Sequence, residues 1–252
     1  MRGEGHGKKI ALGTAALAVA VLLKAFYSTA SVNHLRWLLA PTVWLVSIVS
    51  GESFTFENYS GYMNPDGSFL IAAPCSGLNF LIAAFLLLSV LSLWKSGEVR
   101  WTSLPQSLLI AYVITLAANT VRIAAALELH RMDPPMIWIN PEEMHRLEGI
   151  FVYFGFLLAL FVVAESLNSS ERRGGIRWIA WSLLPLAIYW VTTLGIPLLN
   201  GAHEKHARFF EHALFVVITP PVLMLPLLIT WLVKRRRPSY PSGRRYPSTA
   251  YA

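Results

Sequence analysis

The sequence predicts an all-α protein that crosses a membrane several times. Three observations lead to this fold class. Apolar residues make up 55% of the 252 residues, only 14% are charged, and the apolar residues gather into long runs. A helix needs about 17 to 25 predominantly apolar residues to cross the hydrocarbon core of a bilayer. A membrane barrel would instead alternate polar and apolar residues along each strand.

Six runs have the length of a membrane-spanning helix. They are Ile10–Phe26, Ser76–Trp94, Leu104–Leu129, Leu147–Leu167, Ile176–Leu199 and Ala213–Val233. A seventh run, Trp37–Val49, is shorter, and we expect it to lie in the interface or to re-enter. The sequence therefore predicts six to seven transmembrane helices in a single domain, residues 1–237. The tail at 238–252 is rich in Pro, Ser, Tyr and Arg, and we expect it to be disordered and cytoplasmic.

Basic residues flank the apolar runs and set the expected topology. The net charge of +7 comes mainly from Lys and Arg at the ends of these runs, so we expect no nucleic-acid partner. Such clusters mark cytoplasmic loops. With six spans both ends lie inside and segments 52–74, 130–146 and 200–212 lie outside. A seventh span would put the N-terminal cluster outside. The start also resembles a signal peptide, but Lys24 interrupts the end of the first run, so we expect a retained span.

The expected outer segment Ser53–Pro74 has its own pattern. It begins with the aromatic residues Phe54, Phe56 and Tyr59, and Asn64-Pro-Asp-Gly67 follows with strong turn chemistry. Ser68–Ala72 then has the composition of a second strand. The pattern predicts a small hairpin that leads directly into Cys75.

Two polar residues lie deep in the run Leu104–Leu129, which is the fourth in chain order when Trp37–Val49 is counted. Asn119 and Arg122 are three residues apart and therefore share one face of a helix. Arg122 lies about 27 Å along from Leu104, which puts it in the outer leaflet. An ionisable residue inside a span suggests a functional site. The structural alternative is an arginine that snorkels or pairs with Glu128 or another acid.

Cys75 is the only cysteine, so no intrachain disulfide can form. It begins the third run, where the positive end of a helix favours a thiolate. Gly77 allows close approach of another segment. Free backbone N–H groups near Ser76 and Gly77 could hold an oxyanion. The alternative is a small, packed hydrophobic residue.

His145 precedes the fifth run and belongs to the same expected outer side. By itself it could be a solvated helix start. Three separate segments, however, bring Cys75, Arg122 and His145 to one depth of the membrane. A thiol nucleophile needs a base, which a histidine supplies. An arginine can stabilise the charge of a tetrahedral intermediate, and Asn119 could orient it.

Three short blocks carry a family resemblance, in this order and on separate expected helices: Pro74-Cys75-Ser76-Gly77-Leu78, Asn119-x-x-Arg122-Ile123 and His145-x-x-x-Gly149. They resemble the exosortase/archaeosortase family, and the compact form is most similar to exosortase K. The resemblance covers roughly Phe54–Phe161. It implies a membrane-embedded cysteine protease or transpeptidase (EC class 3.4) without a cofactor. Its substrates would be secreted proteins with a C-terminal motif, a hydrophobic span and a basic tail.

The resemblance also implies residue roles and a location. Cys75 would be the nucleophile, Arg122 the electrostatic stabiliser and His145 the acid/base. Archaeal members are similar but carry arginine at the third position, so His145 suggests the bacterial branch. The expected location is the bacterial cytoplasmic membrane, with the site on the outer side.

Other functions stay open at this point. A transporter could use Asn119 and Arg122 as a buried anion site, a non-catalytic assembly protein could keep the fold, and an acyltransferase could use Cys75. The segment with His203, His206 and His212 invites a zinc interpretation. Its His-Glu-x-His spacing lacks the i,i+4 ligand pair of a metalloprotease helix, so we expect a solvated helix or a substrate contact there, and no metal.

Overall fold

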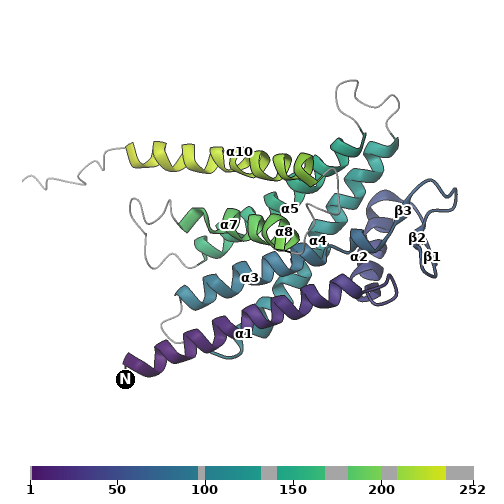
Figure 1. Cartoon of the computed structure of the whole chain (residues 1–252). Coiled ribbons are helices and arrows are strands. Elements are labelled where there is room, and N and C mark those ends of the chain that lie inside the picture. Colours follow the sequence, from purple (N-terminus) through teal and green to yellow (C-terminus); the bar gives the residue numbers. More distant parts are fainter. Residues whose placement is uncertain (1, 96–99, 132–140, 168–180, 200–208, 237–252) are drawn as a thin grey trace, which may run out of the picture.

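The computed structural model describes residues 2–95, 100–131, 141–167, 181–199 and 209–236. Helices form the body of the molecule (Figure 1). They are α1 (Arg2–Thr29), α2 (Arg36–Ser50), α3 (Leu78–Lys95), α4 (Ser103–Arg131), α5 (Pro141–Ser166), α7 (Leu184–Trp190), the π-helical turn η2 (Val191–Gly195), α8 (Ile196–Leu199) and α10 (Phe209–Arg236). The prediction of an all-α membrane protein with several spans is confirmed.

Five helical stretches in the described part are long and apolar enough to cross a membrane: His6–Thr29, Ala73–Trp94, Ser103–Arg131, Arg146–Ser166 and Ala213–Thr230. The two other expected elements are shorter. Arg36–Ser50 is an apolar helix of 15 residues, which agrees with its prediction as a partial segment. The described portion of the predicted span Ile176–Leu199 is the short helix Leu184–Leu198, which contains a π-helical turn.

A three-stranded antiparallel sheet precedes α3, with strand order β1 (Thr55–Glu57), β2 (Gly61–Met63) and β3 (Leu70–Ile71). The predicted turn and second strand belong to the β2–β3 pair, but the strand before this turn is Gly61–Met63 and not the segment with Phe54, Phe56 and Tyr59. The turn is closed by a hydrogen bond from Gly67 N–H to the Asn64 carbonyl (3.1 Å). The sequence pattern missed the turn between β1 and β2, where Tyr59 adopts a left-handed backbone (φ +72°) that non-glycine residues seldom take. The sheet lies at the end of the bundle where α1 ends and α3 begins (Figure 1).

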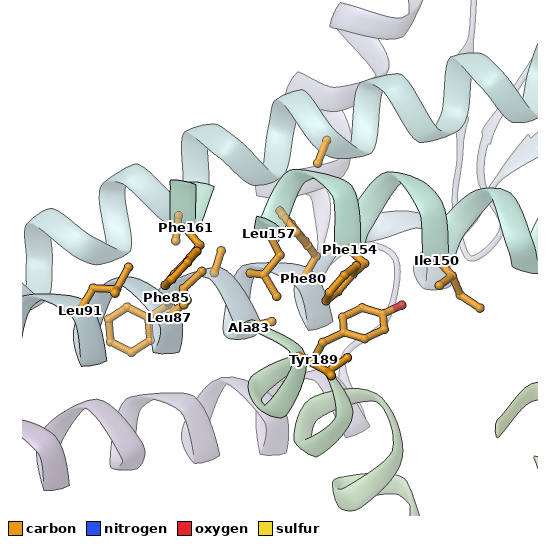
Figure 2. Close-up of a cluster of buried hydrophobic side chains, with 14 of the residues drawn as sticks. Phe80, Ala83, Phe85, Leu87, Leu91, Ile150, Phe154, Leu157, Phe161 and Tyr189 are labelled. Atoms are coloured by element: carbon orange, nitrogen blue, oxygen red, sulfur yellow. The ribbon is translucent and has the colours of Figure 1, made fainter. Parts of the chain in front are cut away.

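The helix α3 is the centre of the bundle. The apolar window of this span is 67% buried, against 17% for α1 and 33% for α4 and α5. Phe85 on α3 packs with Phe154 and Phe161 on α5, and all three side chains are fully buried (Figure 2). The large exposed side chains of the other helices, such as Leu109 and Val113 on α4, suit a surface that faces lipid.

A second core lies beside the sheet and supports the start of α3. Cys75 packs against it, and its buried members come from the turn before α2 and from α2, β2, β3, α3 and α4: Val32, Leu35, Leu38, Leu39, Val43, Val46, Tyr62, Ile71, Leu78, Leu81 and Ile123. The helix α2 contacts both α4 and the turn that carries Cys75. This core therefore fixes the cysteine relative to α4.

Candidate active site

Cys75 lies in a single 3₁₀ turn, η1 (Ala73–Ser76), between β3 and α3. The Cys75 N–H donates to the Ala72 carbonyl (2.9 Å) and Pro74 occupies the first turn, where its missing N–H does no harm. Gly77 ends the turn in the left-handed conformation (φ +74°). The α-helix therefore begins at Leu78, three residues after the cysteine. The expectation that Cys75 itself opens the long helix is corrected by this extra turn.

The missing side chain of Gly77 makes room for α4. A β-carbon at this position would lie 3.2 Å from Cγ of Asn119 and 3.2 Å from Cγ2 of Thr115. Ser76 and Asn119 are fully buried. The turn that holds the cysteine is thus pressed against one face of α4.

Asn119 connects α4 to the cysteine directly. Its Nδ2 donates to the Cys75 carbonyl oxygen at 2.6 Å, and its Oδ1 accepts a hydrogen bond from the Tyr153 hydroxyl at 2.8 Å. Arg122 Nη1 donates to the same hydroxyl at 3.4 Å, and the guanidinium carbon lies 5.4 Å from the centre of the Tyr153 ring. Asn119 and Arg122 share one helix face, as their spacing predicts, and both meet α5 there.

Tyr153 was missed by sequence reasoning. It lies inside the apolar run Leu147–Leu167, where a tyrosine reads as one more packed aromatic residue. Its ring stacks on Phe80 of α3, with centroids 5.1 Å apart and planes at 15°. The available signal was a hydroxyl within an otherwise apolar stretch, because such a group needs a partner when buried.

Charged and polar groups from two further places approach this cluster. Arg122 lies within electrostatic range of Cys75 and of Glu148 on α5. The Tyr27 hydroxyl near the end of α1 comes close to Ser76, within electrostatic range of Cys75 and Arg122. Neither Tyr27 nor Glu148 was singled out from the sequence. The structure thus places Cys75, Ser76, Gly77, Asn119 and Arg122 together.

His145 lies in α5, one helical turn before Gly149. Its side chain is outside the described part of the chain, so its approach to Cys75 stays a prediction. His203, His206 and the His212 side chain are likewise outside it. Among the residues that could be searched, no group of three His, Cys, Asp or Glu side chains is arranged to hold a metal ion.

Fold and site together define a polytopic helical membrane protein with a buried polar cluster around a single thiol. The chain belongs to the transmembrane exosortase family, because the family model described as "Transmembrane exosortase (Exosortase_EpsH)" matches residues 3–164. The matched range contains Cys75, Asn119, Arg122 and His145. No curated protein and no solved structure matches the chain. The family part of the resemblance is confirmed, and the exosortase K form stays a prediction.

Proposed function

We propose that this protein is a membrane-embedded cysteine peptidase or transpeptidase that cleaves C-terminal sorting signals of secreted proteins. Its location would be the outer side of a bacterial cytoplasmic membrane. The observation that carries the proposal is the hydrogen bond from Asn119 to the Cys75 carbonyl, next to Arg122. Family membership supports a sorting-related role in the membrane.

The arrangement suits acyl transfer. His145 takes the proton of the Cys75 thiol as the sulfur attacks the scissile carbonyl, forming a C–S bond and a tetrahedral oxyanion. Arg122 stabilises the negative charge, with backbone N–H groups near Ser76 and Gly77 as further donors. The intermediate collapses to a thioester as His145 gives a proton to the departing amine. An incoming amine or water then attacks the thioester and returns the thiol.

The substrates would be proteins with a cleavage motif, a hydrophobic span and a basic tail. Their motif adjoins a membrane span, so the substrate helix would approach laterally from the bilayer. The transporter alternative needs a polar route through the bundle from Asn119 and Arg122. The interior that such a route must cross is filled by Phe85, Phe154 and Phe161, which favours the peptidase.

The test is mass spectrometry of secreted and membrane proteins in a host that contains such substrates. We expect truncated C-termini with the natural chain and none with Cys75→Ala. Arg122→Gln should lower product formation by about 100-fold or more, the scale of one lost oxyanion donor. His145→Ala should also abolish product, whereas His130→Ala should not, since His130 lies at the far end of α4 beside Phe69. An unchanged product pattern with Cys75→Ala would rule out the peptidase.

A further inference from the structure

We infer that Tyr153 is a positioning residue that links Arg122 to the peptide group of Cys75 through Asn119. The inference rests on the proposed function in one respect, namely that Cys75 is the nucleophile. The link itself is a chain of three hydrogen bonds that joins η1, α4 and α5. It involves Cys75 O, Asn119, the Tyr153 hydroxyl and Arg122 Nη1.

The chemistry of the three side chains allows only one direction for this chain of bonds. An arginine donates and cannot accept, so the Tyr153 oxygen must accept from Arg122. The single hydroxyl proton of Tyr153 then goes to Asn119 Oδ1 (2.8 Å). The amide of Asn119 is thereby oriented with Nδ2 toward the Cys75 carbonyl (2.6 Å). Without the tyrosine hydroxyl, Asn119 Oδ1 would lose its donor, and the amide would be held by its bond to the Cys75 carbonyl alone.

The oriented amide controls the backbone of the nucleophile. The peptide group between Cys75 and Ser76 is planar, so a bond to its carbonyl oxygen also fixes the direction of the Ser76 N–H. Asn119 and Ser76 have no exposed surface, and hydrogen bonds in such places are worth more than in water. The hydroxyl of Tyr153 therefore sets both the Arg122 guanidinium and the thiol-bearing turn.

The ring of Tyr153 is held independently of its hydroxyl by the stack on Phe80. Tyr153→Phe should keep that stack and remove only the hydroxyl. The chain offers a matched control in Tyr112 of α4. Its ring stacks on Trp37 (5.7 Å, 16°), and its hydroxyl donates to the Trp37 carbonyl (2.9 Å), which is not a member of the link.

The first readout is the steady-state kinetics of the full chain in proteoliposomes with a substrate identified by the mass spectrometry. We expect Tyr153→Phe to lower kcat by about 10- to 100-fold while KM changes little, because misplacement of catalytic groups costs this much. Tyr112→Phe should leave both near the natural values. Equal losses in the two variants, or a kcat for Tyr153→Phe equal to that of the natural chain, would overturn the inference.

The second readout needs no substrate. Cys75 is the sole cysteine, so the rate of iodoacetamide alkylation reports on this thiol alone. Tyr153→Phe should change that rate by about 5-fold or more. In an Asn119→Ala background the same substitution should change it much less, because the two residues act as one unit. Full additivity of the two substitutions, or an unchanged rate, contradicts the link. If Cys75→Ala leaves all products intact, the proposed peptidase function is wrong. The alkylation rate still tests the hydrogen-bonded link, because it does not depend on catalysis.

Discussion

Gly149 of α5 lies directly against Arg122 of α4. A β-carbon at position 149 would be 3.2 Å from Nε of Arg122 and 3.9 Å from its Cδ. The contact leaves the arginine side chain just enough room to pass α5 on its way to Tyr153. The glycine in the block His145-x-x-x-Gly149 thus has no side chain at a place where Arg122, on a different helix, needs the space.

Gly149→Ala should therefore lower activity while the fold remains stable. Alanine is favoured over glycine inside a helix by about 1 kcal/mol, and Arg122 can shift to relieve the contact. The matched control is Gly155→Ala on the same helix, where a new β-carbon meets nothing within 4 Å. Product formation and thermal unfolding in detergent measure the two effects. Equal activity of the two variants would show that the Gly149–Arg122 contact has no role in catalysis.

Gly77→Ala should cost more stability than Gly51→Ala. Both glycines adopt nearly the same left-handed backbone, with φ of +74° and +73°, so both variants lose about 1–2 kcal/mol from strain. Only Gly77 also meets Asn119 and Thr115 at 3.2 Å, whereas Gly51 has open space. The difference between the two unfolding temperatures isolates the contact with α4. Identical shifts would mean that α4 moves away freely.

Lys24→Met should loosen α1 from α3. The Lys24 ammonium donates to Asn79 Oδ1 at 2.8 Å, one turn after Cys75, and lies 5.4 Å from the Tyr27 ring centre. Methionine keeps an apolar stem without the donor, and we expect a loss of about 1–2 kcal/mol in the free energy of unfolding. In an Asn79→Leu background the same substitution should cost clearly less, because the partner is already gone. A full-sized loss there would assign the effect to packing.

The ion pairs of Arg131 should contribute little. Arg131 pairs with Glu128 on α4 and with Glu52, which follows α2, and the side chains of Arg131 and Glu52 are 39% and 32% exposed. Exposed pairs contribute less than about 1 kcal/mol and weaken with salt. Glu52→Gln should accordingly lower stability slightly at low ionic strength and not at high salt. A large, salt-independent loss would show that this bridge fixes α2 against α4.

The apolar runs predicted the long helices because membrane-spanning segments must satisfy their backbone internally and face lipid. Asn119 and Arg122 stood out because polar residues inside such runs are costly. Tyr153, Glu148 and Tyr27 could not be found this way. Their contribution depends on how α5 and α1 rotate about their axes and where they lie beside α3 and α4. When nearly every face of a helix is apolar, its sequence gives little indication of which face packs against the neighbouring helices.

The turn between β1 and β2 was missed for a related reason. Tyr59 adopts a backbone conformation that its residue type disfavours, so only the paired strands around it reveal the turn. Of the span predicted at Ile176–Leu199, the structure describes residues 181–199, and the helix there contains a π-helical turn. Composition does not indicate such a turn.

The shortness of α2 has a consequence for the surrounding lipid. Its 15 residues rise about 1.5 Å each, or about 22 Å in all, against a hydrocarbon layer of about 30 Å. A partial segment of this length has an end inside the hydrocarbon layer, and a bilayer adapts to such mismatch by local thinning, at a cost of fractions of a kcal/mol per Å. Because α2 touches the turn that carries Cys75, the thinnest lipid would lie beside the thiol. A polar motif that adjoins the membrane span of a substrate would then have the shortest distance to travel into the membrane at the place where Cys75 lies.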